Sequence, residues 1–146
     1  GVMRIIGRGV ATARDLHVLR KDLPKPENLL LLNALGPVQL KAVIRNSLAL
    51  VSASLEEGFD YPVMEAKSEG IPTLLSEIPV HKEFHLESSL FFPVHDDGSV
   101  FTFQLSRLLG DNLLWSDLSQ AGRDLAQSLS IEVQQEEIRR LIDQFN

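Results

Sequence analysis

Short runs of apolar residues alternate along most of the chain with longer segments in which apolar residues recur at helical spacing. The apolar runs predict five strands, over residues 2–6, 29–32, 47–53, 72–76 and 89–94. The segments between them predict helices over 11–21, 38–45 and 61–69, and a short helix that begins near Pro79. Strands that are apolar on both faces are typical of parallel sheets covered by helices. We therefore expect an α/β domain with a doubly wound, Rossmann-like parallel sheet of about five to six strands and helices on both faces.

The pattern becomes helical from residue 99 to the end of the chain, where apolar residues recur at intervals of three and four. Ser130 is suited to cap a last helix over 131–145, since its hydroxyl can accept a hydrogen bond from the first helical turn. The apolar stripe of that helix would be formed by Ile138, Leu141, Ile142 and Phe145.

Composition and charge exclude several classes of protein. The 146 residues carry a net charge of −6 and show no basic stripe, so we expect no nucleic-acid partner. The absence of cysteine excludes disulfides and cysteine-bound metals and fits a reducing compartment. No apolar run reaches the ~18 residues of a membrane-spanning helix. We expect a cytoplasmic protein, with peripheral contact of the full protein at the inner face of a membrane left open.

The loop after the third predicted strand carries the candidate chemistry, because ligands of such sheets bind beyond the carboxyl ends of the strands. Its sequence "SLEEGFDYPVMEAKSEGIP" places Glu57 and Glu65 eight positions apart around the start of a helix. One interpretation is structural: Asp60 caps the helix, Pro62 lies in its first turn, Gly58 has a positive φ, and Glu65 is solvated.

The other interpretation is functional. The free N–H groups and partial positive charge of a helix start suit a pyrophosphate, whereas carboxylates suit sugar hydroxyls. Glu57 and Glu65 would then hold two sugars on either side of the phosphates.

The stretch "LVSASLEEGFDYPVMEAKSEGIPTLLSEIPVHKE" resembles the carboxyl-terminal, donor-binding domain of family 4 retaining glycosyltransferases, which have the GT-B fold. The family pattern has a glutamate, Gly-Phe-Gly, an apolar-Pro pair, and a second glutamate eight places after the first. It continues with a Gly-x-Pro turn and an "IP-x-x-x-E" segment. The chain matches it with Glu57, 58–59, 61–62, Glu65, 70–72 and 78–83, and a weaker resemblance extends over nearly the whole chain.

The resemblance implies a role for each matching residue. Glu57 would contact the transferred sugar beside the reacting carbon, as a nucleophile or as an electrostatic partner, and Glu65 would hold the ribose of the nucleotide. The other donor-binding residues would be Gly58, Phe59, Asp60, Tyr61, Pro62 and Val63 in this loop, with Gly7, Asn33 and Leu35 at the ends of the first two strands.

The chain also departs from the family pattern. Asp60 stands where the family often has glycine, and we favour a helix cap over a contact with a sugar hydroxyl. The resemblance implies that residues 33–36 border the nucleotide base. Asn33 stands where the second strand of the family usually ends in glycine, which weakens this assignment. The family holds its diphosphate with an arginine and a lysine from a loop that would precede this sequence. Arg8 and Lys67 are alternative cations, although a surface position is expected for each.

We therefore expect residues 1–146 to be one nucleotide-sugar-binding domain, a fragment that lacks its first strand and the N-terminal acceptor domain and is inactive alone. The full-length enzyme would move a hexose from a nucleotide-diphosphate sugar to a saccharide or lipid-linked acceptor, without metal or cofactor. The alternatives are a non-catalytic binding module and a nucleotide-sugar epimerase.

Other motifs point to less. His81 and His85 have the i, i+4 spacing of zinc ligands but lack a third ligand. For His81 we favour a position on a helix surface over an approach to the ligand-binding edge of the sheet. The glycines at 7 and 9 lack the third glycine of a dinucleotide fingerprint, and no nucleophile elbow occurs.

Overall fold

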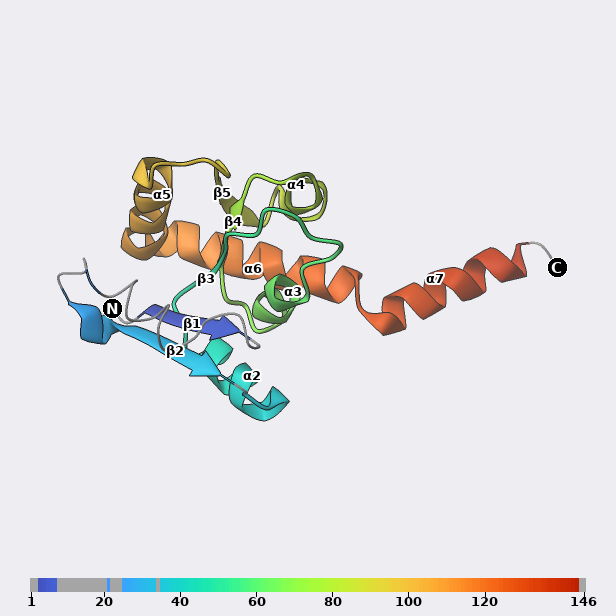
Figure 1. The fold of residues 1–146 in the computed structure, drawn as a ribbon. Coiled ribbons are helices and arrows are strands. Elements are labelled where there is room, and N and C mark those ends of the chain that lie inside the picture. The colour runs from blue at the N-terminus through green and yellow to red at the C-terminus, as the bar shows by residue number, and fades with distance from the viewer. Residues whose placement is uncertain (1–2, 8–20, 22–24, 34, 145–146) are drawn as a thin grey trace. The chain divides into compact units, whose positions relative to one another are not determined.

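The computed structural model describes residues 3–7, 21, 25–33 and 35–144, and Figure 1 shows its elements. The chain divides into two compact units, residues 1–40 and residues 41–146, which are called here the first and the second unit. Each unit is described by itself. Among the described residues, no helix is long and apolar enough to cross a membrane.

The first unit contains a parallel pair of strands. Strand β1 (Met3–Gly7) pairs with β2 (Leu29–Asn33) in a register that runs from Met3 beside Leu29 to Gly7 beside Asn33. A short 3-10 helix, η1 (Pro26–Asn28), leads into β2. Both strands were predicted from the sequence. The predicted helix over 11–21 lies outside the described residues except for residue 21, which is in a turn.

The second unit is built on three parallel strands in the order β3-β4-β5, namely β3 (Leu50–Ser52), β4 (Thr73–Ser76) and β5 (Ser89–Phe92). Helix α2 (Pro37–Arg45) spans the boundary between the units, and α3 (Tyr61–Ser68) and α4 (Pro79–His85) connect the strands. The predicted parallel α/β fold is confirmed. Among the described residues, the strands pair as a two-stranded sheet in the first unit and a three-stranded sheet in the second.

The centre of the second unit is β4, all of whose residues are buried. Leu74 and Leu75 are inaccessible to solvent, and Val63 and Ala66 of α3 are equally buried. A strand covered on both faces explains why "PTLLS" is uniformly apolar or small, without the alternation of a half-exposed strand. Because all three strands are parallel, their carboxyl ends and the loop before α3 lie at the same edge of the sheet.

Three helices follow the sheet: α5 (Ser99–Gly110), α6 (Asn112–Ser128) and α7 (Ile131–Asp143). Helix α6 packs against α3. The predicted cap of the last helix is confirmed, since Ser130 accepts a hydrogen bond from the N–H of Val133. None of the residues of α7 is buried, so the apolar stripe predicted for it is exposed at Ile138, Leu141 and Ile142.

Candidate functional site

The loop between β3 and α3 is tied to the sheet by side-chain hydrogen bonds. Ser52 Oγ donates to Asp60 Oδ2 over 2.7 Å, which joins the residues on either side of the loop 53–59. Ser76 Oγ, at the end of β4, donates to the backbone oxygen of Ser54 over 2.6 Å. Ser54 Oγ in turn donates to Glu57 Oε1 over 2.7 Å. The half-buried carboxylate of Glu57 is therefore held by a residue that is itself fixed to the central strand.

Asp60 caps helix α3, as the structural interpretation of the sequence predicted. Its Oδ1 accepts a hydrogen bond from the N–H of Val63 over 3.4 Å. Val63 is therefore engaged within the protein and Pro62 has no N–H to offer. Among the described residues, the N–H groups of Phe59, Asp60 and Tyr61 have no acceptor. These three amides remain free for a ligand.

Gly58 differs from the sequence prediction, because it is not among the described glycines with positive φ, which are Gly70 and Gly98. A Cβ atom added to Gly58 would meet no heavy atom within 4 Å. Neither the backbone conformation of Gly58 nor its described neighbours require a glycine. The open space beside this residue would allow a ligand to approach the backbone closely.

Glu65 lies in the second turn of α3 and lines a hollow of about 290 Å³. The hollow is lined by Phe59, Tyr61, Met64, Glu65, Ser68, Ala126 and Leu129. The rings of Phe59 and Tyr61 meet edge to face with centroids 5.2 Å apart, and Tyr61 is 70% exposed. Three of the predicted site residues, Phe59, Tyr61 and Glu65, are thus brought together. Glu57 is not among the residues that line this hollow.

His81 is fully buried behind the loop, which contradicts the prediction of a helix-surface position. Its Nδ1 lies 2.9 Å from the backbone oxygen of Ser76, which can only accept, so Nδ1 carries a hydrogen. Its Nε2 lies 3.1 Å from Asp60 Oδ2. Asp60 Oδ2 is therefore positioned to accept a hydrogen bond from Nε2 whenever that nitrogen carries a hydrogen.

Lys67 is also buried, with 1% of its surface exposed, which corrects the prediction of a surface position. Its Nζ donates to the backbone oxygen and Oγ of Ser88 over 2.6 and 2.7 Å, and to Ser89 Oγ over 2.9 Å. Burial lowers its pKa to about 7. The helix periodicity was a signal for this burial that the prediction did not use. Lys67 follows the buried Val63 by four positions and so shares its helix face.

His85 shares the buried face of α4 with His81, and the two ring centroids are 6.2 Å apart. Burial, together with the positive charge of Lys67, lowers the pKa of His85 to about 4. Its buried Nδ1 has no hydrogen-bond partner among the described residues. Within these same parts of the chain, no group of three or more potential ligands is placed to hold a metal ion.

The remaining predicted site residues belong to the first unit. Gly7 and Asn33 are register partners at the carboxyl ends of β1 and β2, and Leu35 follows two positions later. The structure brings Gly7 and Asn33 side by side at one strand end, as the prediction required. Arg8 lies outside the described residues.

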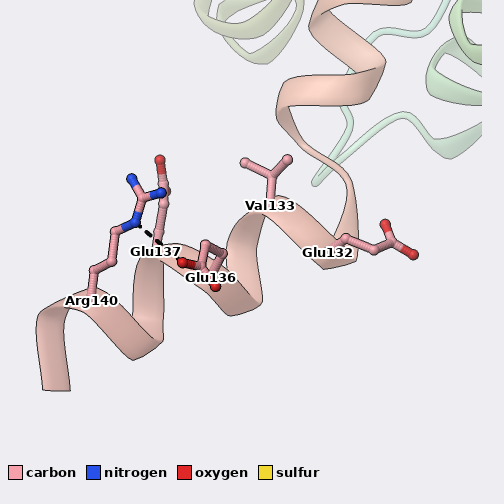
Figure 2. Close-up of a pocket in the computed structure, with 5 residues that line it drawn as sticks. All are labelled: Glu132, Val133, Glu136, Glu137 and Arg140. Atoms are coloured by element: carbon pink, nitrogen blue, oxygen red, sulfur yellow. Dashed lines mark hydrogen bonds and ion pairs between the residues drawn. The ribbon is translucent and has the colours of Figure 1, made fainter. Parts of the chain in front are cut away.

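A second hollow, of about 310 Å³, runs along α7. Figure 2 shows that its five lining residues, Glu132, Val133, Glu136, Glu137 and Arg140, all project from this one helix. Arg140 Nε lies 3.4 Å from Glu136 Oε1 one turn away. A hollow with a single helix for its wall is a surface groove between exposed side chains.

No protein-family model matches this chain. Among curated proteins, it is similar to the O-antigen chain mannosyltransferase RfbU of Salmonella typhimurium, with 30% identity over 87 residues. That match covers 60% of this chain and 25% of RfbU, so the chain spans about a quarter of this curated relative.

Three solved structures share the fold. TarM matches with a TM-score of 0.74 and 16% identity, over 94% of this chain and 28% of TarM. Sucrose-phosphate synthase from Thermosynechococcus elongatus matches with a TM-score of 0.76 and 18% identity, over 98% and 39% of the two chains. The C-terminal domain of the glycosyl transferase group 1 family protein LpcC from Francisella tularensis gives 0.68 and 20%, over 82% and 65%. These matches confirm the resemblance to glycosyltransferases of the GT-B type.

Proposed function

Because the fold of this chain is that of a glycosyltransferase carboxyl-terminal domain, we propose that it forms the donor-binding half of a retaining glycosyltransferase. The full-length enzyme transfers a hexose from a nucleotide-diphosphate sugar to a hydroxyl of a saccharide or lipid-linked acceptor. The observation that carries the proposal is the arrangement around the start of α3, where the free N–H groups of Phe59, Asp60 and Tyr61 lie between Glu57 and Glu65 in the sequence.

The two glutamates have separate roles in this proposal. Glu65 is exposed and accepts hydrogen bonds from the vicinal hydroxyls of the ribose with its two carboxylate oxygens. Glu57, held at Oε1 by Ser54, contacts the transferred sugar, where a fixed negative charge stabilises the positive charge that develops at the reacting carbon. The open space beside Gly58 accommodates the close approach of the sugar.

The diphosphate lies against the free N–H groups of Phe59, Asp60 and Tyr61 and the partial positive charge of the α3 N-terminus. Three acidic side chains near this position would repel it, but Asp60 is buried and its carboxyl oxygens are engaged by Val63, Ser52 and His81. The repulsion is therefore smaller than the sequence suggests. No metal ion or cofactor is needed in this proposal, because helix amides and cations elsewhere in the full protein stabilise the leaving group.

The test begins with calorimetric titration of the full-length protein with UDP, GDP and ADP. The activity assay follows release of nucleoside diphosphate from a panel of nucleotide-sugars, with GDP-mannose first because of the similarity to a mannosyltransferase. Binding of one nucleotide and turnover of its sugar conjugate are expected. Absence of any nucleotide binding would refute the donor-binding role and favour the non-catalytic module.

The role of Glu65 is tested separately by Glu65→Gln. We expect about a tenfold loss of affinity for the nucleoside diphosphate, which is the usual effect of weakening a hydrogen bond to a charged group. Glu87→Gln, at an exposed position after α4, is the matched control and should bind as the unmodified protein does. Unchanged affinity of the Glu65 variant would remove this residue from the ribose site.

A further inference from the structure

Residue His81 lies behind the candidate site, buried beyond the reach of any ligand, yet both of its ring nitrogens contact groups that shape the loop of Glu57. One contact is to the backbone oxygen of Ser76 at the end of β4, and the other is to the carboxyl group of Asp60 at the start of α3. A buried polar group is costly unless it is paired, and an apolar side chain would fill the same volume at lower cost. The geometry therefore needs a reason beyond packing.

The first connection from His81 to the loop runs through Asp60. Oδ2 of Asp60 receives both His81 Nε2 and Ser52 Oγ, at 3.1 and 2.7 Å. Ser52 ends β3 and Asp60 precedes α3, so this oxygen holds the beginning and the end of the loop 53–59 together. Asp60 Oδ1 is turned toward the N–H of Val63. The position of Oδ2 is therefore held by its contacts with His81 and Ser52.

The second connection runs through Ser76. Its backbone oxygen accepts from His81 Nδ1, and its hydroxyl donates to the backbone oxygen of Ser54. Ser54 then donates through its own hydroxyl to Glu57 Oε1. The two connections converge on Glu57, one by closing the loop and the other by direct hydrogen bonds.

We propose that His81 is a positioning residue that fixes the Glu57 carboxylate for the transferred sugar through its contacts with Asp60 and Ser76. This inference rests on the proposed function for its consequence, but the effect on Glu57 is a property of the free protein. His81 touches neither substrate nor reacting atoms and acts only through the loop.

The test uses the full-length protein with glutamate labelled with ¹³C at the carboxyl carbon, and the Glu57 resonance is identified by its loss in Glu57→Gln. His81→Leu removes both contacts. His81→Gln keeps a donor near the Nε2 position, toward Asp60, and His81→Asn keeps one near the Nδ1 position, toward Ser76. The control is His85→Gln, since His85 is buried on the same helix face and its Nδ1 has no hydrogen-bond partner among the described residues.

We expect the Glu57 resonance in His81→Leu to move toward that of Ser54→Ala, in which the direct hydrogen bond to Glu57 is lost. Gln and Asn each keep one of the two contacts and should give shifts between those of His81→Leu and the unmodified protein, and His85→Gln should leave the shift unchanged. Thermal unfolding confirms that each variant is folded. If folded His81→Leu keeps the Glu57 resonance of the unmodified protein, the proposal is overturned. Should the leucine variant not fold, the proposal is overturned if both His81→Gln and His81→Asn keep that resonance.

The consequence for the donor is measured by titrating the same variants with a nucleotide-sugar and with its nucleoside diphosphate. Mispositioning of Glu57 should weaken the nucleotide-sugar about tenfold and leave the diphosphate nearly unchanged, because only the sugar meets Glu57. Movement of the Glu57 resonance with equal losses for both ligands would support the positioning role and refute the contact of Glu57 with the sugar. The two hypotheses are thus separable.

Discussion

The buried ammonium group of Lys67 makes the stability of this protein depend on pH in an unusual range. Its pKa falls from 10.5 to about 7 because burial penalises the charged form. Each pH unit of difference between the folded and unfolded pKa is worth about 1.4 kcal/mol, so the fall corresponds to at most about 5 kcal/mol. Three oxygen acceptors contact Nζ and favour the ammonium form, which makes this value an upper limit.

The sign follows from proton counting. Between pH 7 and pH 10.5 the unfolded chain binds more protons at Lys67 than the folded protein does, so the free energy of unfolding rises with pH in this window. Below pH 7 the ammonium is charged in both states and the full cost of burying it remains. Replacement of the lysine by methionine, which is similar in length and carries no charge, should abolish this rise.

The assay is urea unfolding of the unmodified protein and of Lys67→Met at several pH values from about 7 to about 9.5, where the difference in free energy of unfolding isolates Lys67. We expect that difference to shift in favour of the unmodified protein by up to about 1.4 kcal/mol for each pH unit. Lys82→Met, at an exposed position, is the control and should give a constant difference. A constant difference for Lys67→Met as well would show that the serine oxygens stabilise the buried ammonium fully.

Two further predictions concern buried or strained positions. The pKa of His85 is lowered from 6.5 to about 4, so the free energy of unfolding should fall by up to about 3 kcal/mol as the pH falls through this range. In urea unfolding, the free energy of His85→Phe should fall by less over the same range. Gly70 follows the C-cap of α3 with φ at 70°, and a Cβ there would also displace the side chain of Arg123, so Gly70→Ala should lower the free energy of unfolding by at least about 1 kcal/mol. Gly110→Ala is its control, and equal effects of the two glycine substitutions would contradict the argument from φ.

Local signals in the sequence predicted the elements well. The apolar runs located all five strands, and the caps at Asp60 and Ser130 were correctly placed, because a cap depends on residues within one turn. The association of strands into sheets involves partners distant in sequence, so the order of the strands could not be predicted from these local signals. The resemblance to glycosyltransferases rests on residues that follow one another in a single continuous stretch, so it could be recognised from the sequence.

The buried polar residues could not be predicted in the same way. Lysine and histidine are usually exposed, so the expectation of surface positions for Lys67 and His81 followed the general rule. What reverses it here is tertiary: Lys67 finds acceptors at Ser88 and Ser89, and His81 finds Asp60 twenty-one positions earlier. The helix periodicity that puts both side chains on inward faces was readable, whereas the partners that make those positions tolerable were not.

The buried contact between Asp60 and His81 constrains how this sequence can evolve. Replacement of either residue alone leaves the other as a buried polar group without this partner. Substitutions at the two positions are therefore expected to occur together. The same dependence applies to protein engineering. A designer who transplants the segment from Ser52 to Tyr61 into a related scaffold must also transfer His81 from α4, because the loop depends on the contacts of this histidine.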